Sequence, residues 1–389
     1  MVLANRMANL GTESAFTVLA RARELEAQGK EIVHLEIGEP DFATPKHIRD
    51  AAIRALEAGF THYVPAPGLT EVRQSIAKNA GQRRDIEVDW RQVVVTPGAK
   101  PIMFFTILAL AQRGVEVVYP NPGFPIYESM IRFCGARPVP MPLLGEKNYH
   151  PDLKELAKKI TDRTRLIILN SPNNPCGSVL SREEITAIAG MVRQHPNLYV
   201  MTDEVYKDIL YEGSHFSIAS LPGMRDRTII LDGLSKSYAM TGWRLGYGVF
   251  PEALTEHIVR LAVNSVSCAT AFSQRAIIDA LEGPQDSVVA MKEEFQRRRQ
   301  VIVEGLRSIP GISCPMPAGA FYAFANVAKT GLSSEEFEHR ALNEAGVALL
   351  AGTSFGRYGK GYVRFSYANS VENLQKAVAR LRAFAGGLG

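Results

Sequence analysis

The sequence has few cysteines and few histidines, and neither type is arranged as a structural or metal-binding set. Four cysteines occur in 389 residues, and they form no C-x-x-C pair and no regular framework. This scatter predicts free thiols in a reducing compartment. The eight histidines show no HxxxH or HExxH spacing, so we expect no dedicated metal site.

Long hydrophobic runs and a large excess of one charge are also missing. No apolar run reaches the roughly 20 residues that a membrane-spanning helix needs, and residues 1–11 lack the basic and then apolar layout of a secretion signal. We therefore expect a cytoplasmic protein with no membrane partner. The net charge is only +4, and the densest basic run, residues 297–299, follows Glu293 and Glu294 at helical spacing. Nucleic-acid binding is not expected from such a run.

The composition that remains is typical of a globular enzyme. Hydrophobic residues make up 46% of the chain and charged residues 22%, values that argue against long disordered tracts. A chain of 389 residues favours two domains. From about residue 93 onward, apolar runs alternate with helical patterns, which predicts an α/β fold with a parallel sheet wrapped by helices. The Glu-Gly-Pro break at residues 282–284 predicts a link to a smaller domain.

Residues 235–247, SKSYAMTGWRLGY, carry the strongest chemical signal in the chain. Lys236 follows the apolar run 228–231, so it is expected at the end of a strand, where open α/β sheets bind ligands. Such a lysine can bind an aldehyde covalently, and Arg244, eight residues later, suits a phosphate. From residue types alone, a surface lysine and a structural arginine would be the commoner interpretation.

The local pattern favours the functional interpretation. Ser-Lys, an aromatic residue two positions after the lysine, and then Gly-Trp-Arg-Leu-Gly strongly resemble the pyridoxal-phosphate site of class I/II aminotransferases. This family has the aspartate-aminotransferase fold, also called fold type I. The resemblance implies that Ser235, Lys236 and Arg244 bind pyridoxal 5′-phosphate, with Lys236 holding the cofactor and Arg244 its phosphate.

A second segment, Thr-Pro-Gly-Ala-Lys at residues 96–100, lies between a predicted strand and a helix that starts near Pro101. The backbone amides of Gly98, Ala99 and Lys100 would point from a helix N-terminus at an anion, which is the phosphate cradle in the family. Lys100 departs from the commoner family version. In one bacterial branch of aspartate aminotransferases, a lysine here is associated with the substrate's distal carboxylate. A second phosphate contact and solvent exposure stay open as alternatives.

Three further segments resemble the walls of the family's cofactor site. Phe124, in a loop of sequence NPGFPIY, occupies the place of the aromatic ring that stacks on the pyridine. Asn174, in NSPNNPCG, matches the asparagine that bonds the cofactor's phenolic oxygen and the substrate carboxylate, although Cys176 replaces the usual threonine. In the D-x-x-Y pattern, Asp203 would pair with the pyridine nitrogen and Tyr206 with the phenolate.

The resemblance also implies residues for the substrate and for a second subunit. Gly38, in a GEPDF segment, lies where the family's N-terminal arm meets the substrate. Arg364, in VRFSYA, resembles the arginine that binds the α-carboxylate bidentately. Tyr63 fits a pattern whose tyrosine reaches the neighbouring subunit's cofactor phosphate. The resemblance therefore implies a homodimer with shared active sites.

These motifs, spread from Gly38 to Arg364 in family order, predict a fold-type-I aminotransferase, closest to the bacterial aspartate/aromatic branch. We expect an N-terminal arm with part of the small domain at residues 1–45 and a large cofactor-binding domain at 46–284. The rest of the small α+β domain is expected at 285–389. The predicted reaction is a ping-pong transfer of the amino group of an L-amino acid to a 2-oxo acid, with 2-oxoglutarate as the expected acceptor. The predicted catalytic residues are Lys236, Asp203 and Tyr206.

The sequence leaves the substrate open. Lys100 favours a dicarboxylate such as aspartate, whereas the aromatic residues Phe16, Phe124 and Tyr127 would also suit aromatic or aliphatic amino acids. An aromatic or alanine-type aminotransferase and a cysteine-conjugate β-lyase are alternatives on the same scaffold. A cofactor-binding regulatory module is disfavoured because no helix-turn-helix extension or basic arm is evident.

Overall fold

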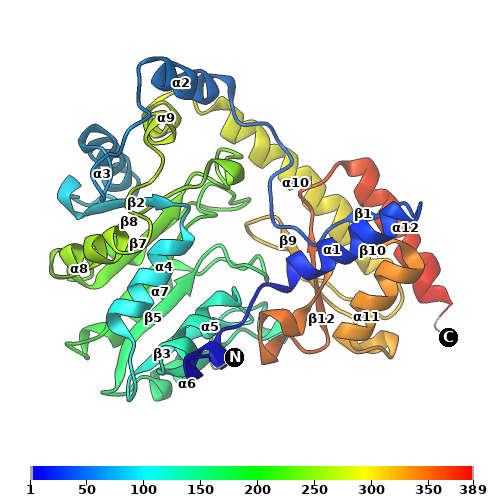
Figure 1. Cartoon of the computed structure of the whole chain (residues 1–389). Coiled ribbons are helices and arrows are strands. Elements are labelled where there is room, and N and C mark those ends of the chain that lie inside the picture. Colours follow the sequence, from blue (N-terminus) through cyan, green and yellow to red (C-terminus); the bar gives the residue numbers. More distant parts are fainter. Residues whose placement is uncertain (1–2, 388–389) are drawn as a thin grey trace.

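The structure is a computed structural model that describes residues 3–387. Within these residues the larger sheet has seven strands in the order β2-β8-β7-β6-β5-β3-β4 (Figure 1). Strand β8 is antiparallel to both neighbours, and the other pairs are parallel. The predicted mostly parallel α/β sheet is confirmed. The strands are β2 Val93–Pro97, β3 Glu116–Asn121, β4 Arg137–Pro142, β5 Thr164–Asn170, β6 Tyr199–Asp203, β7 Thr228–Gly233 and β8 Leu245–Val249.

Helices cover both faces of this sheet because its central strands are apolar on both sides. In β5, Leu166 and Ile168 pack in the core formed with α4, α5 and α8, whereas Ile167 and Leu169 pack on the opposite side against α7. This alternation follows from the two-residue period of a strand. The helices are α2 Lys46–Glu57, α3 Thr70–Arg84, α4 Lys100–Leu110, α5 Ile126–Phe133, α6 Leu153–Lys159, α7 Arg182–Arg193, α8 Glu252–Val263 and α9 Ala271–Glu282.

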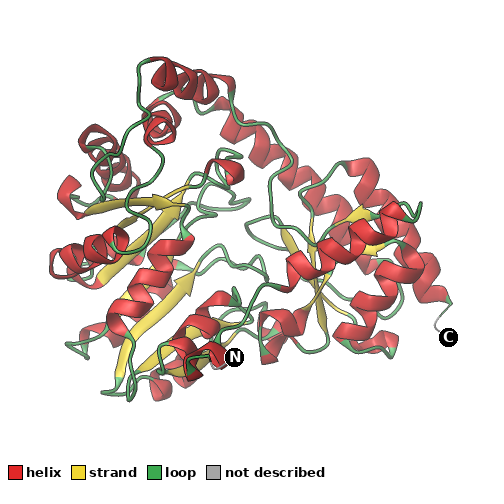
Figure 2. Cartoon of the chain, in the orientation of Figure 1, coloured by secondary structure: helices red, strands yellow, loops and turns green. Residues whose placement is uncertain are grey.

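A smaller α+β unit lies beside the large sheet, and Figure 2 shows its strands as a separate group. Strands β11, β12 and β9 form an antiparallel sheet, and β1 pairs in parallel with β10. Helix α10 runs from the side of α2 and α9 into this unit (Figure 1). The elements are α1 Ser14–Ala27, β1 Val33–His34, α10 Asp286–Arg307, β9 Tyr322–Asn326, α11 Ser334–Arg340, β10 Val347–Ala348, β11 Leu350–Ala351, β12 Tyr362–Ser366 and α12 Val371–Gly386.

Segments near both ends of the chain build the smaller unit, because β1 near the start pairs with β10 near the end. Its core contains stacked rings of Phe295 and Phe321, 5.1 Å apart. Helix α10 begins at Asp286, shortly after the Glu-Gly-Pro break. The domain boundaries at residues 45/46 and 284/285 stay a prediction that this arrangement supports.

Two segments differ from what their residue patterns predict, a strand at residues 32–37 and an α-helix at residues 334–345. The apolar run 32–37 forms a strand only at Val33–His34, because the chain then turns toward β12, where the Leu35 carbonyl accepts the amide of Ser366. The helical pattern at 334–345 ends as α-helix at Arg340 and continues as one π-helical turn to Ala345. No helix in the described part of the chain combines the length and apolarity needed to cross a membrane.

Candidate active site

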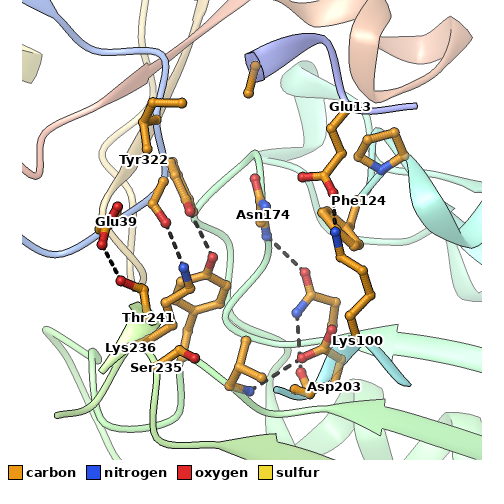
Figure 3. A pocket seen from close by; sticks show the side chains of 18 of the residues that line it. Glu13, Glu39, Lys100, Phe124, Asn174, Asp203, Ser235, Lys236, Thr241 and Tyr322 are labelled. Carbon is orange, nitrogen blue, oxygen red and sulfur yellow. Dashed lines mark hydrogen bonds and ion pairs between the residues drawn. The ribbon is translucent and has the colours of Figure 1, made fainter. Parts of the chain in front are cut away.

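A cavity of about 500 Å³ lies between the two sheets, at the carboxyl ends of the large sheet's parallel strands (Figure 3). This is the edge at which open α/β sheets place their ligands. Residues far apart in the sequence meet there. The predicted site residues that line the cavity are Gly38, Ala99, Lys100, Phe124, Asn174, Asp203, Tyr206, Ser235, Lys236, Arg244 and Arg364.

Lys236 follows β7 and points into the cavity (Figure 3). Its Nζ donates a hydrogen bond of 2.6 Å to the carbonyl oxygen of Gly38. Burial lowers the pKa of Lys236 to about 8, and the nearby cations Arg364 and Arg244 act in the same direction. The amine is therefore partly neutral, and thus nucleophilic, near neutral pH.

Asp203 is the last residue of β6 and is buried at the bottom of the cavity. Its Oδ2 accepts a 2.5 Å hydrogen bond from the hydroxyl of Tyr127. Burial raises the pKa of Asp203 to about 6, against the opposing effect of the Tyr127 hydrogen bond. Within residues 3–387 this carboxylate makes no ion pair. A ligand cation placed beside Asp203 would therefore stabilise its ionised form.

A chain of amide contacts connects Asp203 with Arg364 on β12 of the other sheet. The Asn170 side chain donates to the Asp203 carbonyl at 3.2 Å and accepts the Asn174 amide at 2.9 Å. The Asn174 side-chain oxygen then accepts a 3.0 Å hydrogen bond from Arg364 Nη1. This chain fixes the position of the guanidinium relative to the carboxylate.

Arg364 is a buried cation that forms no ion pair with a carboxylate within residues 3–387. Its Nη2 donates to the carbonyl of Glu36 at 2.5 Å, and within residues 3–387 its Nε has no hydrogen-bond partner. Burial lowers the pKa of Arg364. A planar guanidinium with a free N–H, lining a cavity, is suited to bind a carboxylate.

The opposite end of the cavity is built to hold an anion. A Cβ atom on Gly98 would collide with the Arg244 guanidinium, and one on Gly246 would collide with the backbone of Ala99. These glycines let Arg244 lie close to the first turn of α4, where free amides and the helix dipole attract negative charge. Gly98 therefore lies next to residues that line the cavity but does not line the cavity itself.

Tyr63 is the one predicted site residue that lies apart from the cavity within the described chain. It is in the loop before α3, and 91% of its surface is exposed. The role expected for it requires a second subunit, so its position in a single chain does not test that role.

Several cavity residues were not predicted as site residues. Tyr127, whose aromatic ring the sequence had placed only in the lining, bonds Asp203, and the Tyr322 hydroxyl lies 2.7 Å from that of Tyr206. Glu13 pairs with Lys100, and Glu39 accepts a hydrogen bond from Thr241. Tyr127 could have been found, since it follows Phe124 by three positions, in the first turn of α5. Glu13 belongs to no recognisable motif.

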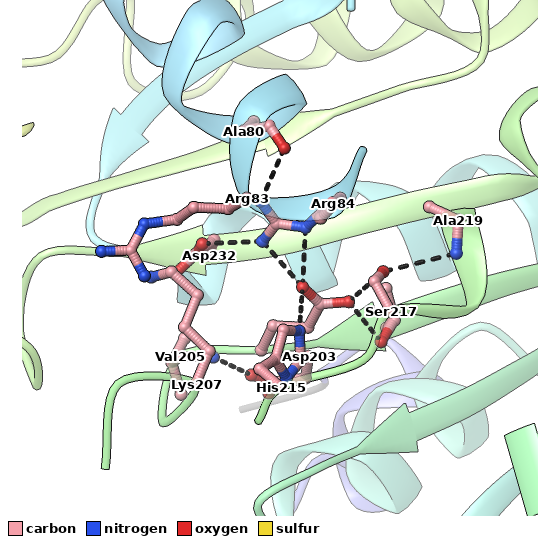
Figure 4. A network of polar contacts seen from close by, with 12 residues as sticks. Ala80, Arg83, Arg84, Asp203, Val205, Lys207, His215, Ser217, Ala219 and Asp232 are labelled. Atoms are coloured by element: carbon pink, nitrogen blue, oxygen red, sulfur yellow. Dashed lines mark hydrogen bonds and ion pairs between the residues drawn. The ribbon is translucent and has the colours of Figure 1, made fainter. Parts of the chain in front are cut away.

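A buried ionic network supports the strands that carry the site (Figure 4). Arg84, at the end of α3, lies 2.7 Å from Glu204 and 3.0 Å from Asp232, and all three side chains are inaccessible to solvent. Lys207 also pairs with Asp232, and His215 with Glu204. Glu204 directly follows Asp203, and Asp232 precedes Lys236 by four positions. The network therefore holds the ends of β6 and β7 together.

The fold and the cavity define an α/β enzyme with one reactive lysine amine, a buried carboxylate and two anion-binding arginines. The chain matches the model of the family described as aminotransferase class I and II over residues 30–381. It therefore belongs to this family, whose members depend on pyridoxal phosphate, and it is a transaminase that acts on amino acids and 2-oxo acids.

Individual relatives cover nearly the whole chain. The arginine–pyruvate transaminase of Pseudomonas aeruginosa is 40% identical, with 95% of this chain and 93% of the relative covered. An aspartate aminotransferase of Pyrococcus horikoshii is 38% identical, with 92% of each chain covered. The structure of aspartate aminotransferase from Thermus thermophilus with maleate superposes with a TM-score of 0.94 at 35% identity, covering 98% of this chain and 99% of that one.

The lowered pKa of Lys236 predicts a distinct pH profile for its chemical labelling. In protein freed of cofactor, acylation of Lys236 should rise with pH around a midpoint of about 8. Lys158 is a suitable internal comparison, because its hydrogen bond with Glu155 raises its pKa above the ordinary value of 10.5. Peptide mass spectrometry after brief labelling measures both residues in one sample. Parallel rises for the two lysines would contradict the assignment.

The buried network predicts a strong dependence of stability on Arg84. Arg84→Leu leaves Glu204 and Asp232 without their buried cation, which should lower the free energy of unfolding by about 3–5 kcal/mol. Arg260→Leu is the matched control, since it breaks an exposed pair with Glu256 on one helix and should change stability little. Urea unfolding of both variants measures the difference, and equal small losses would refute the prediction.

Proposed function

We propose that this chain binds pyridoxal 5′-phosphate through Lys236 and uses it in a ping-pong transfer of the amino group of an L-amino acid to a 2-oxo acid. The observation that carries this proposal is that one cavity contains an amine of lowered pKa, two arginines, and a buried carboxylate that forms no ion pair within residues 3–387. These groups are Lys236, Asp203, Arg244 and Arg364.

The residues present fit the cofactor in each of its parts. Arg244, Ser235 and the first turn of α4 beside Gly98 and Ala99 form a cradle for its phosphate, and a Cβ on Gly98 would displace the Arg244 guanidinium from it. Asp203 would pair with its ring nitrogen, Phe124 offers a flat apolar face, and Tyr206 and Asn174 would bond its phenolic oxygen. Lys236 would bind its aldehyde carbon.

In the reaction, the cofactor supplies an electron-withdrawing ring that stabilises negative charge at the substrate α-carbon. Arg364 and Asn174 hold the substrate α-carboxylate, and Gly38 lies beside it as backbone that accepts a hydrogen bond from Lys236. Lys236 Nζ, neutral in part near pH 8, takes the α-proton as general base. Asp203 would keep a positive charge on the ring nitrogen of the bound cofactor, because a buried carboxylate stabilises a cation at short range.

The substrate pair that we favour is aspartate with 2-oxoglutarate as acceptor. Lys100 lines the cavity and offers a cation to a distal carboxylate, and relatives named aspartate aminotransferase share 38% identity with this chain. An aromatic or aliphatic donor is the second candidate, because Phe16, Phe124 and Tyr127 also line the cavity. A β-lyase reaction would differ by forming pyruvate and ammonia from a cysteine conjugate.

We also propose that the chain forms a homodimer with shared active sites and acts in the cytoplasm. The 91% exposure of Tyr63 supports an interface at the loop before α3, since a large aromatic side chain is seldom left so exposed on a monomer. Residues 46–284 would then form the large domain, and residues 1–45 and 285–389 would form the arm and the small domain.

The proposed chemistry predicts a donor-dependent change in colour. Amino acids added singly, without an oxo acid, should bleach the yellow absorption of the reconstituted protein when they are donors. Aspartate and glutamate should bleach it if Lys100 binds a distal carboxylate, and only aromatic or aliphatic amino acids should do so otherwise.

Lys236→Ala should lower turnover more than about 1,000-fold with an unchanged circular dichroism spectrum, whereas the exposed Lys158→Ala should not. Turnover at the wild-type rate in Lys236→Ala would refute the assignment.

Shared active sites predict recovery of activity in mixed dimers. Tyr63→Ala and Lys236→Ala homodimers should each be weak or inactive, because the first lacks a phosphate ligand and the second lacks the base. A mixed dimer contains one site that combines Lys236 of one subunit with Tyr63 of the other. Co-expressed variants should therefore exceed both parents in specific activity. Activity equal to the mean of the two parents, or a monomeric mass by sedimentation, would contradict this arrangement.

A further inference from the structure

The cation that is expected to recognise a distal carboxylate is already paired with an acidic side chain of the protein itself. Lys100 Nζ forms an ion pair with the carboxylate of Glu13, and the same ammonium lies 5.5 Å from the centre of the Phe124 ring. Glu13 directly precedes α1 in the smaller unit, whereas Lys100 begins α4 of the large sheet. Figure 3 shows this pair beside Phe124, with Lys236 and Thr241 on the other side of the cavity.

The other charged groups of the cavity have an expected ligand or, for Glu39, a hydrogen-bond partner on the side of Lys236. Arg364 and Arg244 suit the substrate carboxylate and the cofactor phosphate, and Asp203 suits the ring nitrogen. Glu39 accepts a hydrogen bond from the hydroxyl of Thr241. Within residues 3–387, Glu13 is the acidic partner of Lys100, and Lys100 pairs with no second carboxylate. Glu13 and Lys100 are therefore the groups left to meet the side chain of a substrate.

We propose that Glu13 is a specificity-determining residue that competes with dicarboxylic substrates for Lys100. This inference rests on the proposed function. A substrate with a distal carboxylate binds Lys100 by exchanging with Glu13. A substrate with an uncharged side chain leaves the pair in place and lies against the aromatic residues. Glu13 thereby sets the ratio at which the pocket binds the two substrate classes.

The burial of the pair favours such an exchange. The side chains of Glu13 and Lys100 are 21% and 46% exposed, so their ion pair is screened by water and weak enough to be replaced by a similar one. A fully buried pair, such as that of Arg84 and Glu204, would be costly to break. Residues 10 to 12, just before Glu13, are exposed, which leaves the displaced carboxylate a path to water.

The position of Glu13 also gives it an influence on the reacting groups. Its negative charge acts to raise the pKa values of Lys236 and Arg364, although burial lowers both overall. The negative charge of Glu13 therefore opposes the binding of a second anionic group, in addition to the carboxylate that Arg364 binds. A dicarboxylate that displaces Glu13 removes this repulsion and takes over its ion pair.

The test compares two unreactive ligands of equal chain length, succinate and butyrate, which differ by the distal carboxylate. Calorimetric titration of the holoenzyme gives the dissociation constant of each. In Glu13→Gln the preference for succinate over butyrate should rise about fivefold, the upper range for a partly exposed ion pair. The ratio of kcat/KM for aspartate to that for phenylalanine should rise in parallel.

Two control variants separate this mechanism from a general effect of charge. Glu24→Gln makes the same change in net charge on the exposed side of α1, where Glu24 pairs with Arg21, and it should leave the preference unchanged. In a Lys100→Gln background, Glu13→Gln should bring a clearly smaller gain for succinate, because only the loss of repulsion remains and no Lys100 ammonium is released.

Three results would overturn the inference: an unchanged preference in Glu13→Gln, equal tightening of succinate and butyrate, or a full gain that persists without Lys100. Failure of the proposed function is distinguishable from these. If no donor bleaches the holoenzyme, the proposed reaction fails while the succinate and butyrate titrations still report on Glu13. If donors react and the preference does not move, only the role of Glu13 fails.

Discussion

The site depends on how buried charge is balanced where β6 and β7 end. Three buried carboxylates, those of Asp203, Glu204 and Asp232, lie within this region. The guanidinium of Arg84 forms ion pairs with the last two. Burial opposes ionisation, but Arg84 and His215 hold the pKa of Glu204 well below its usual range. Asp203 is left outside this pairing, so burial raises its pKa instead. The network thus stabilises the strands and leaves the carboxylate that faces the cavity available to a ligand cation.

The smaller unit contributes the opposite charge. Arg364 on β12 is buried, has a free Nε and makes no ion pair within residues 3–387. Asn170 and Asn174 join its guanidinium to the Asp203 carbonyl by hydrogen bonds. A buried anion and a buried cation therefore lie on opposite walls, each without a charged partner, and Lys236 lies in the same cavity. A cofactor with a ring cation, bound together with a substrate that carries a carboxylate, neutralises both walls at once.

Local sequence predicted those parts of the fold and the cavity that short segments encode. The apolar run 228–231 predicted the strand that precedes Lys236, and the Thr-Pro-Gly-Ala-Lys segment predicted a helix that starts near Pro101. Motif residues after the parallel strands reach one cavity because these strands share a carboxyl edge. Contacts between distant segments could not be predicted. Glu13 lies 87 positions from Lys100, and Arg84 lies 120 positions from Glu204. Such pairs depend on how two elements pack, and periodicity carries no information about that packing.

The two kinds of charge in the cavity separate catalysis from substrate choice. Within residues 3–387 the inner groups, Asp203 and Arg364, have no charged partners. In the proposed function they would meet parts that every substrate and the cofactor share, so their contribution would not vary with the donor. The outer groups, Glu13 and Lys100, neutralise each other, and in the proposed arrangement they would contact only the side chain that differs between donors. Because the outer pair is partly exposed, exchanging it changes affinity by a modest factor and leaves the inner geometry intact. Under this proposal, substitutions at the outer pair would change the donor preference of this chain without altering the residues that move the proton.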